Sequence, residues 1–250
     1  MNMLRMASVV LAAMAVALPA SASVSFSGSS GSRAAAVTFD IVAGKLQVKL
    51  DNTSTNDVLV PIDVLTAVFF NLSGGAGQLA RFSATADGGT YQGTTLVNPA
   101  GTVVGGEWAY AAVSSGSLPG VNAGISSSGL GLFGPGDVFP GANLSGPADP
   151  NGLQYGLTSV GDNKATGNTP ILTEPLTNHS VTFLLTPGAG FSLTQISNVF
   201  FQYGTALTEP RFPGGEGGGG PGGGNTPEPA TLALLGFGLL AGAVARRKRT

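Results

Sequence analysis

Two runs of alternating apolar and polar residues, joined at a glycine, constrain the fold of this chain more than any other feature. Every second residue is apolar from Val37 to Ile41, and the pattern returns from Leu46 to Leu50 after Gly44. Successive side chains of a β-strand point to opposite faces, so a period of two indicates a strand with one buried and one wet face. The two runs therefore predict an antiparallel hairpin.

Other segments carry the same type of signal. The run 65–70 is apolar at every position except Thr66, which is typical of a strand covered on both faces. Shorter β patterns are found at residues 90–97, 107–113, 180–186 and 196–204. The 40 glycines and 16 prolines among 250 residues break long helices and supply turns. We therefore expect an all-β fold, a single antiparallel sandwich or jelly-roll-like domain with long loops rich in Gly and Pro.

The middle of the chain, residues 114–170, is dominated by Gly, Ser, Pro, Asn and Asp. An unstructured segment of this length is unusual inside a compact domain, so we expect part of it to pack as irregular loop or short strands. Six apolar residues are the expected anchors of this segment: Leu130, Leu132, Phe133, Leu153, Tyr155 and Leu157.

Charge and cysteine content exclude several classes of function. The chain has no cysteine, so it forms no disulfide, thiol nucleophile or cysteine-ligated metal site. Between Ser23 and Thr226 six basic residues stand against twelve acidic ones, a net charge of −6. Such a surface repels phosphate backbones, which are bound by clustered Lys and Arg. We expect no nucleic-acid partner.

Residues 1–22 have the three parts of a secretory signal peptide. A short positive region ends at Arg5, an apolar stretch follows to Leu18, and Ala20-Ser21-Ala22 fits the small-x-small rule of signal peptidase. We expect cleavage after Ala22, so that the body is exported and the mature chain begins at Ser23.

The other end of the chain also has three parts. Pro227, Glu228 and Pro229 precede an uncharged stretch, which as a helix from Ala230 to Ala245 would extend about 24 Å, slightly short of a bilayer core of ~30 Å. Four basic residues follow directly and predict a cytoplasmic C-terminus: Arg246, Arg247, Lys248 and Arg249. Residues 213–226 are mostly glycine and predict a flexible linker.

This tail resembles the PEP-CTERM sorting signal of Gram-negative bacteria, in which Pro-Glu-Pro precedes a transmembrane helix and an arginine-rich end. The resemblance implies that the helix is a temporary inner-membrane anchor and that an exosortase, a membrane-embedded cysteine protease, cuts near the motif. A plain C-terminal anchor is the alternative. The expected organisation is a signal peptide (1–22), a β-rich extracytoplasmic domain (23–212), a linker (213–226) and a sorting and anchor segment (227–250).

The body carries a second resemblance. Residues 60–70, 152–159 and 196–205 are similar to segments of a family of exosortase-dependent surface proteins. That family has no established activity, so the resemblance implies a place at the cell surface or in the extracellular matrix but no catalytic residues. Our first hypothesis is a non-enzymatic protein associated with exopolysaccharide or biofilm.

A carbohydrate-binding module is the second hypothesis. Trp108 and Tyr110 are two residues apart in an expected strand and so lie on the same face. Their rings are a candidate stacking platform for a sugar, although aromatic residues in a β-rich chain more often fill the core.

Catalytic groups are sparse. His179 is the only histidine, and no Gly-x-Ser-x-Gly motif accompanies it, so the sequence does not indicate a serine triad. With one histidine and no cysteine, it does not indicate a zinc site of ordinary ligand type either. A polysaccharide hydrolase would need two facing carboxylates, and the sequence pairs none of its four candidates: Asp63, Glu107, Glu174 and Glu209. We expect no enzyme and no cofactor, with the hydrolase as the least favoured alternative.

Side chains with oxygen atoms in the loops are candidate ligands for a calcium ion. Asp137, Asp149 and Asp162 lie near Asn143, Asn151 and Asn163, and calcium prefers oxygen ligands of this kind. No EF-hand spacing is present, and turn formation explains these residues without an ion. We therefore expect no metal site. Four Asn-x-Ser sequons, to which we assign no function, begin at Asn52, Asn71, Asn143 and Asn178.

Overall fold

The computed structural model describes residues 23–114, 116 and 118–217. The expected signal peptide, most of the linker and the sorting segment lie outside these residues. Within the described part of the chain, no helix is long and apolar enough to cross a membrane, and the expected span at 230–245 is not in this part.

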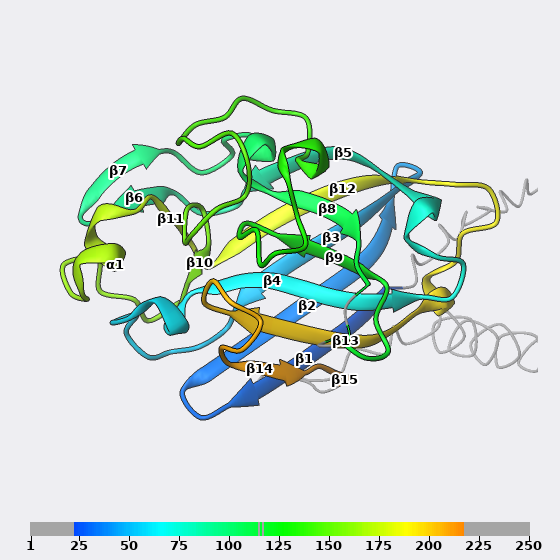
Figure 1. Cartoon of the computed structure of the whole chain (residues 1–250), viewed down its shortest axis with the longest axis horizontal. Helices are drawn as coiled ribbons and strands as arrows, with labels where there is room; N and C mark the ends of the chain where they lie inside the picture. The colour runs from blue at the N-terminus through cyan, green and yellow to red at the C-terminus, as the bar shows by residue number, and fades with distance from the viewer. Residues whose placement is uncertain (1–22, 115, 117, 218–250) are drawn as a thin grey trace, which may run out of the picture. The chain divides into compact units, whose positions relative to one another are not determined.

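Two β-sheets pack face to face (Figure 1). The first has the strand order β15-β1-β2-β3-β12-β5. Its members are β1 (Val24–Ser30), β2 (Arg33–Val42), β3 (Lys45–Asn52), β5 (Leu79–Ala86), β12 (Ser180–Pro187) and β15 (Gly215–Glu216). We call it the six-stranded sheet.

The second sheet has nine strands, seven of them in the order β14-β13-β4-β10-β11-β6-β7, with β9 bonded to β4 and β8 to β9. Its members are β4 (Leu65–Leu72), β6 (Thr90–Gln92), β7 (Thr95–Asn98), β8 (Ala109–Ala112), β9 (Ala123–Ser126), β10 (Leu157–Thr158), β11 (Leu176–Asn178), β13 (Ile196–Tyr203) and β14 (Arg211–Pro213). The helices are short: α1 (Thr169–Thr173) and 3-10 turns η1 (Pro61–Asp63), η2 (Ala76–Gln78), η3 (Gly105–Glu107), η4 (Pro135–Asp137) and η5 (Leu193–Gln195).

These elements confirm the predicted all-β sandwich. The strands pair antiparallel except for β10 and β11, which run parallel over two residues. The predicted hairpin is β2 and β3, paired from Ala35↔Asn52 to Val42↔Lys45. Ala43 and Gly44 connect the two strands with φ values of 49° and 75°, the left-handed conformation that a tight two-residue hairpin turn needs.

Strand β4 is covered on both faces, as its continuous apolar run predicted. Val68 and Phe70 belong to the main core between the sheets, where the rings of Phe70 and Phe39 meet edge to face with centroids 5.3 Å apart. Ala67 and Phe69 point the other way, into a second apolar cluster. The remaining members of that cluster come mostly from residues 109–133, so the loop-rich middle of the chain forms the outer cover of β4.

The middle segment packs as expected. The described parts of residues 114–170 contain β9, η4, β10 and the first two residues of α1, and otherwise follow irregular paths. Phe133, Leu153, Tyr155 and Leu157 are buried. Leu130 and Leu132 are partly buried against the second apolar cluster.

One predicted boundary needs correction. The linker was expected to begin at residue 213, but Gly215 and Glu216 form β15 and pair with Ser27 and Phe26 of β1. Without β15, β1 would leave main-chain groups unpaired at the edge of the six-stranded sheet, and the first residues after β14 satisfy some of them. The chain thus passes from β14, the last strand of one sheet, to β15, the edge strand of the other.

This crossing requires a glycine at position 28. A side-chain carbon on Gly28 would lie 2.3 Å from the carbonyl oxygen of Pro213, which is too close for any real contact. We expect Gly28→Ala to lower the free energy of unfolding by about 1–3 kcal/mol, because β1 and β14 must separate. The midpoint of urea denaturation measures this change.

Gly215→Ala is the matched control, because the nearest atom to its added carbon would be the Ser27 carbonyl oxygen at 3.9 Å. It should leave the midpoint nearly unchanged. Equal midpoints for the two variants would show that β1 and β14 are not packed as described.

Candidate functional site

The predicted sorting residues lie outside the described residues: Pro227, Glu228, Pro229, Arg246, Arg247, Lys248 and Arg249. The structure does show where the chain leaves the domain toward them. The main-chain N–H of Gly217 donates to the carbonyl of Ser25, 3.3 Å away, at the beginning of β1. The segment that leads to the tail therefore departs beside the first residues of the described chain.

The prediction of a sugar platform at Trp108 and Tyr110 is wrong. The two side chains do share a face, but that face is the main core, where Trp108 is fully buried and Tyr110 is 5% exposed. The Trp108 ring lies 5.1 Å from that of Phe183, and the Tyr110 ring stacks 6.5 Å from that of Phe70. The Tyr110 hydroxyl donates to the carbonyl of Ala76, and burial raises the pKa of this hydroxyl.

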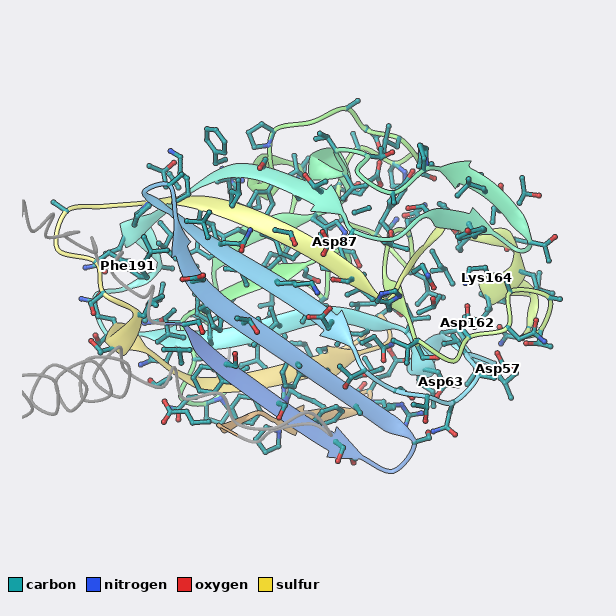
Figure 2. The ribbon with its side chains drawn as sticks, turned by 180° about the vertical axis from the view of Figure 1, so that it is seen from behind. Asp57, Asp63, Asp87, Asp162, Lys164 and Phe191 are labelled. Atoms are coloured by element: carbon teal, nitrogen blue, oxygen red, sulfur yellow. The ribbon has the colours of Figure 1, made fainter. Side chains whose placement is uncertain are left out.

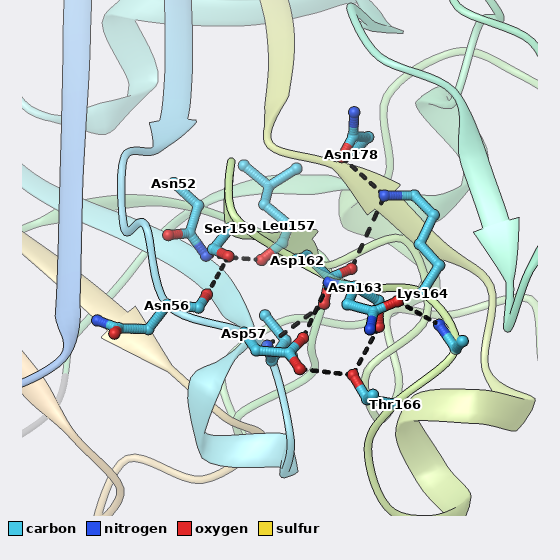
Figure 3. Close-up of polar contacts among 12 residues, drawn as sticks. Asn52, Asn56, Asp57, Leu157, Ser159, Asp162, Asn163, Lys164, Thr166 and Asn178 are labelled. Atoms are coloured by element: carbon cyan, nitrogen blue, oxygen red, sulfur yellow. Dashed lines mark hydrogen bonds and ion pairs between the residues drawn. The ribbon is translucent and has the colours of Figure 1, made fainter.

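Acidic and polar side chains gather instead at one end of the sandwich, where Figure 2 shows Asp57, Asp63, Asp162 and Lys164 near one another and Phe191 at the other end. We use the name distal polar cluster for Asp57, Asp162, Asn163, Lys164 and Thr166 (Figure 3). These residues come from the loop after β3 and from the loop after β10.

Hydrogen bonds in the distal polar cluster join the two loops. Asp57 accepts from the main-chain N–H of Asn163 at 2.9 Å and from the Thr166 hydroxyl at 2.6 Å. Burial acts to raise the pKa of Asp57, but these bonds outweigh it and hold that pKa below its ordinary value. In return, Asp162 accepts from the main-chain N–H of Val58 at 3.3 Å. Each loop thus supplies a carboxylate that binds the main chain of the other.

Lys164 completes the cluster. Its ammonium lies 3.8 Å from a carboxylate oxygen of Asp162, donates to the side-chain oxygen of Asn178 at 3.1 Å, and sits 4.8 Å from the centre of the Tyr91 ring. Only 3% of the Asp162 side chain is exposed, and burial raises its pKa against the opposing effect of Lys164. The ammonium of Lys164 therefore favours the charged form of a buried carboxylate, and burial opposes it.

The distal polar cluster connects two loops and so has a structural role. Asp137 accepts from the main-chain N–H of Gly134 at 2.9 Å and so closes its own turn, as the turn interpretation predicted for it. Asp162 instead contacts Lys164 and the main chain of another loop. Among the described residues, no group of three or more His, Cys, Asp or Glu is placed to hold a metal ion.

Three of the four carboxylates considered for a hydrolase are also bonded within the fold. Asp63 forms an ion pair with Arg33 at 2.8 Å, and Glu209 accepts from the main-chain N–H of Ala206 at 2.8 Å. Glu107 is buried and accepts from the main-chain N–H groups of Ser145, at 2.9 Å, and Leu144. These three side chains hold loops in place.

His179 and Asn52 lie at a junction of strands. The carbonyl of His179, whose φ is 45°, accepts from the main-chain N–H of Asn52 at 2.8 Å. The Asn52 side chain is fully buried and donates to the carbonyl of Leu157. The first of the four sequons therefore begins at a residue inside the fold.

One hollow in the described residues has a volume of about 840 Å³, and we call it the β5–β8 groove. The first residues of β5, the last three of β8 and the segment 137–141 line it, with Ala76, Gly77 and Leu132. Arg81 and Asp137 are the charged residues of this lining. Arg81 donates to the carbonyl of Gly136 at 2.7 Å, and Asp137 caps its own turn. Sequence reasoning missed this groove, because its walls are distant in the chain.

Comparison with known protein families identifies the C-terminal segment. Residues 225–249 match the model of the PEP-CTERM protein-sorting motif. No curated protein and no solved structure matches the chain. The match covers the Pro-Glu-Pro residues, the apolar stretch and the basic end, so the predicted sorting signal is confirmed.

Two Lys–Asp pairs provide a test of the distal polar cluster. Lys164→Met should lower the free energy of unfolding at pH 7 by about 1–2 kcal/mol, because the buried carboxylate of Asp162 loses its counter-charge. Lys49→Met is the control: Lys49 pairs with Asp51 at 3.1 Å but is 49% exposed, and its loss should cost at most about 0.5 kcal/mol.

The pH dependence of the Lys164→Met effect adds a second check. Burial raises the pKa of Asp162, so the folded state takes up its proton before the unfolded state does. As the pH falls through that raised pKa, the carboxyl becomes neutral and the destabilisation of Lys164→Met should shrink. Chemical denaturation at several pH values measures it, and a constant difference would argue against a buried charge.

Glu107 gives a separate prediction. Glu107→Ala should cost roughly 2–3 kcal/mol, because the N–H groups of Leu144 and Ser145 lose their acceptor. Glu107→Gln keeps an acceptor oxygen and should be far milder. Burial raises the pKa of Glu107, so the ionised wild type loses stability relative to Glu107→Gln as the pH rises through that value. Denaturation midpoints between acid and neutral pH test the sign, and equal effects of both substitutions would refute the described bonds.

Proposed function

We propose that this protein is a non-enzymatic component of the cell surface or extracellular matrix of a Gram-negative bacterium, with a structural or adhesive role in exopolysaccharide or biofilm. The observation that carries the proposal is the PEP-CTERM motif at residues 225–249. This motif implies export and processing by an exosortase, which restricts the site of action to the outside of the cell.

The proposed route begins with signal peptidase at residue 22. The body then stays attached to the inner membrane through the C-terminal segment until the exosortase releases it toward the surface. Gly217 is the last described residue and nine residues separate it from Pro227, so the protease would reach its motif without unfolding the sandwich.

The interior of the sandwich supports a role without catalysis. Asp63, Glu107 and Glu209 are acceptors or ion-pair partners that fix loops, and the distal polar cluster fastens two further loops. Side chains bonded in this way contribute to the structure of loops, which favours a role without catalysis. Contact with a polysaccharide would use a surface other than Trp108 and Tyr110, because both rings are buried.

Substitutions in the tail test the sorting route. Glu228→Gln leaves the apolar stretch and the basic end unchanged, so insertion should proceed while cleavage slows, and uncleaved precursor should accumulate in membranes. Replacing residues 246–249 by neutral residues should weaken the topological stop instead, at roughly 1 kcal/mol per charge near an anionic leaflet. Immunoblots of cell fractions separate the two outcomes.

The control is a strain that lacks the exosortase, in which wild-type protein should match the Glu228→Gln precursor in size and location. Mature protein of the same size and place in both strains would eliminate exosortase processing and would leave the plain C-terminal anchor.

A further inference from the structure

Strand β5 has a free edge at one end of the six-stranded sheet. It pairs with β12 over its whole length. On its other side only the second half is covered, where Ala86 donates to Thr102 and Val104 donates to Ala84, each at 2.9 Å. Within the described residues, no strand pairs with Leu79–Ser83 on that side. The uncovered half of β5 is one wall of the β5–β8 groove.

Strand β8 supplies the opposite wall. It pairs with β9 on one side, and on the other it meets the chain at a bridge between Ala109 and Val138 and at a bond from the Phe139 N–H to the Trp108 carbonyl. In the described part of the chain, no strand continues this pairing along Ala111 and Ala112. The groove therefore lies between two strand edges, one from each sheet.

Small residues form part of the walls. Gly77, Ala80, Ala111, Ala112 and Gly141 line the groove, and the rings of Tyr110 and Phe139 beneath it are buried. Such walls offer a sugar little aromatic surface, and the charged side chains of the lining are already bonded. Unpaired main-chain groups at a strand edge instead take up an extended polypeptide as an added strand.

The residues that follow Gly217 are the candidate for the added strand. Their immediate predecessors, Gly215 and Glu216, already add to the edge of β1 as β15. Residues 218–226 consist of six glycines with Pro221, Asn225 and Thr226, so they bring few side chains to the walls, and Pro221 accepts but does not donate main-chain hydrogen bonds. Nine residues reach about 30 Å when extended at ~3.4 Å each, enough to cover either wall of the groove.

The geometry favours a segment from another molecule. β15 and β5 are the opposite edges of the same six-stranded sheet, five strand spacings apart. At ~4.8 Å per spacing this is about 24 Å, so a chain that turned back into its own groove would use most of the nine residues on the way. A second copy has no such constraint.

We propose that the β5–β8 groove accepts residues 218–226 of a second copy of this chain as an added strand. Because the donated segment and the groove are different surfaces, the contact is head to tail. It closes where two copies exchange segments or where copies form a ring, and otherwise its repetition builds an open chain of copies. The inference rests on the proposed function, since exosortase cleavage would free the segment from the membrane.

Two variants of the mature protein, residues 23–226, test the donated segment and the groove separately. Removing residues 218–226 leaves all described residues and takes away the donated segment. Ala112→Trp fills the groove from an exposed position and leaves the segment intact. Val160→Trp places the same bulk at a side chain that is 54% exposed and does not line the groove. Circular dichroism and denaturation midpoints confirm that each variant is folded.

Sedimentation velocity should show wild type and Val160→Trp growing to two and more copies as concentration rises, while the truncated chain and Ala112→Trp each stay single. A mixture of these two should form pairs and nothing larger, because one partner keeps only the groove and the other only the segment. Growth unaffected by either lesion would overturn the proposal.

A wild-type chain that stays single at all concentrations would also overturn it. If residues 218–226 of that chain are protected from hydrogen exchange, its own segment fills the groove. These measurements use purified protein and no exosortase. Their failure would therefore leave the sorting route intact, and an unchanged product in the exosortase-lacking strain would not alter their result.

Discussion

Burial of β4 on both faces is the constraint on which the rest of this molecule depends. One face closes the main core between the sheets through Val68 and Phe70. The other face carries Phe69, whose ring stacks 6.2 Å from that of Phe133 in the loop-rich middle of the chain. A strand that is apolar on both faces has to be covered twice. The second cover is made by loops, which explains why a segment rich in Gly, Ser and Pro is packed rather than free.

Sequence reasoning succeeded where the determining interactions are local. The β2–β3 hairpin depends on side-chain alternation and on the turn at Ala43 and Gly44, all within one short stretch. The sorting motif is likewise linear, and its residues read in order are sufficient to identify it. The continuous apolar run at 65–70 also predicted that both faces of this strand are buried, because neither face is polar.

Sequence reasoning failed where the structure depends on contacts between residues far apart in the chain. The spacing of Trp108 and Tyr110 gave their common face but not its direction, which depends on Phe183 and Phe70 of other strands. Asp57 and Asp162 are 105 positions apart, and only the folded chain brings their loops together. The edge strand β15 could not be anticipated either, because composition alone marks glycine-rich residues as linker and does not reveal an unsatisfied strand nearby.

The position of β15 has a mechanical consequence. A pull on the C-terminal segment enters the domain at Gly217 and acts first on the two-residue pairing of β15 with β1. Next in the chain is β14, which pairs with β13 over three residues, whereas β4 and β13 share a much longer ladder. Under tension the domain should thus yield from its edge inward: β15 separates first, and the loss of β14 then removes Phe212 from the main core.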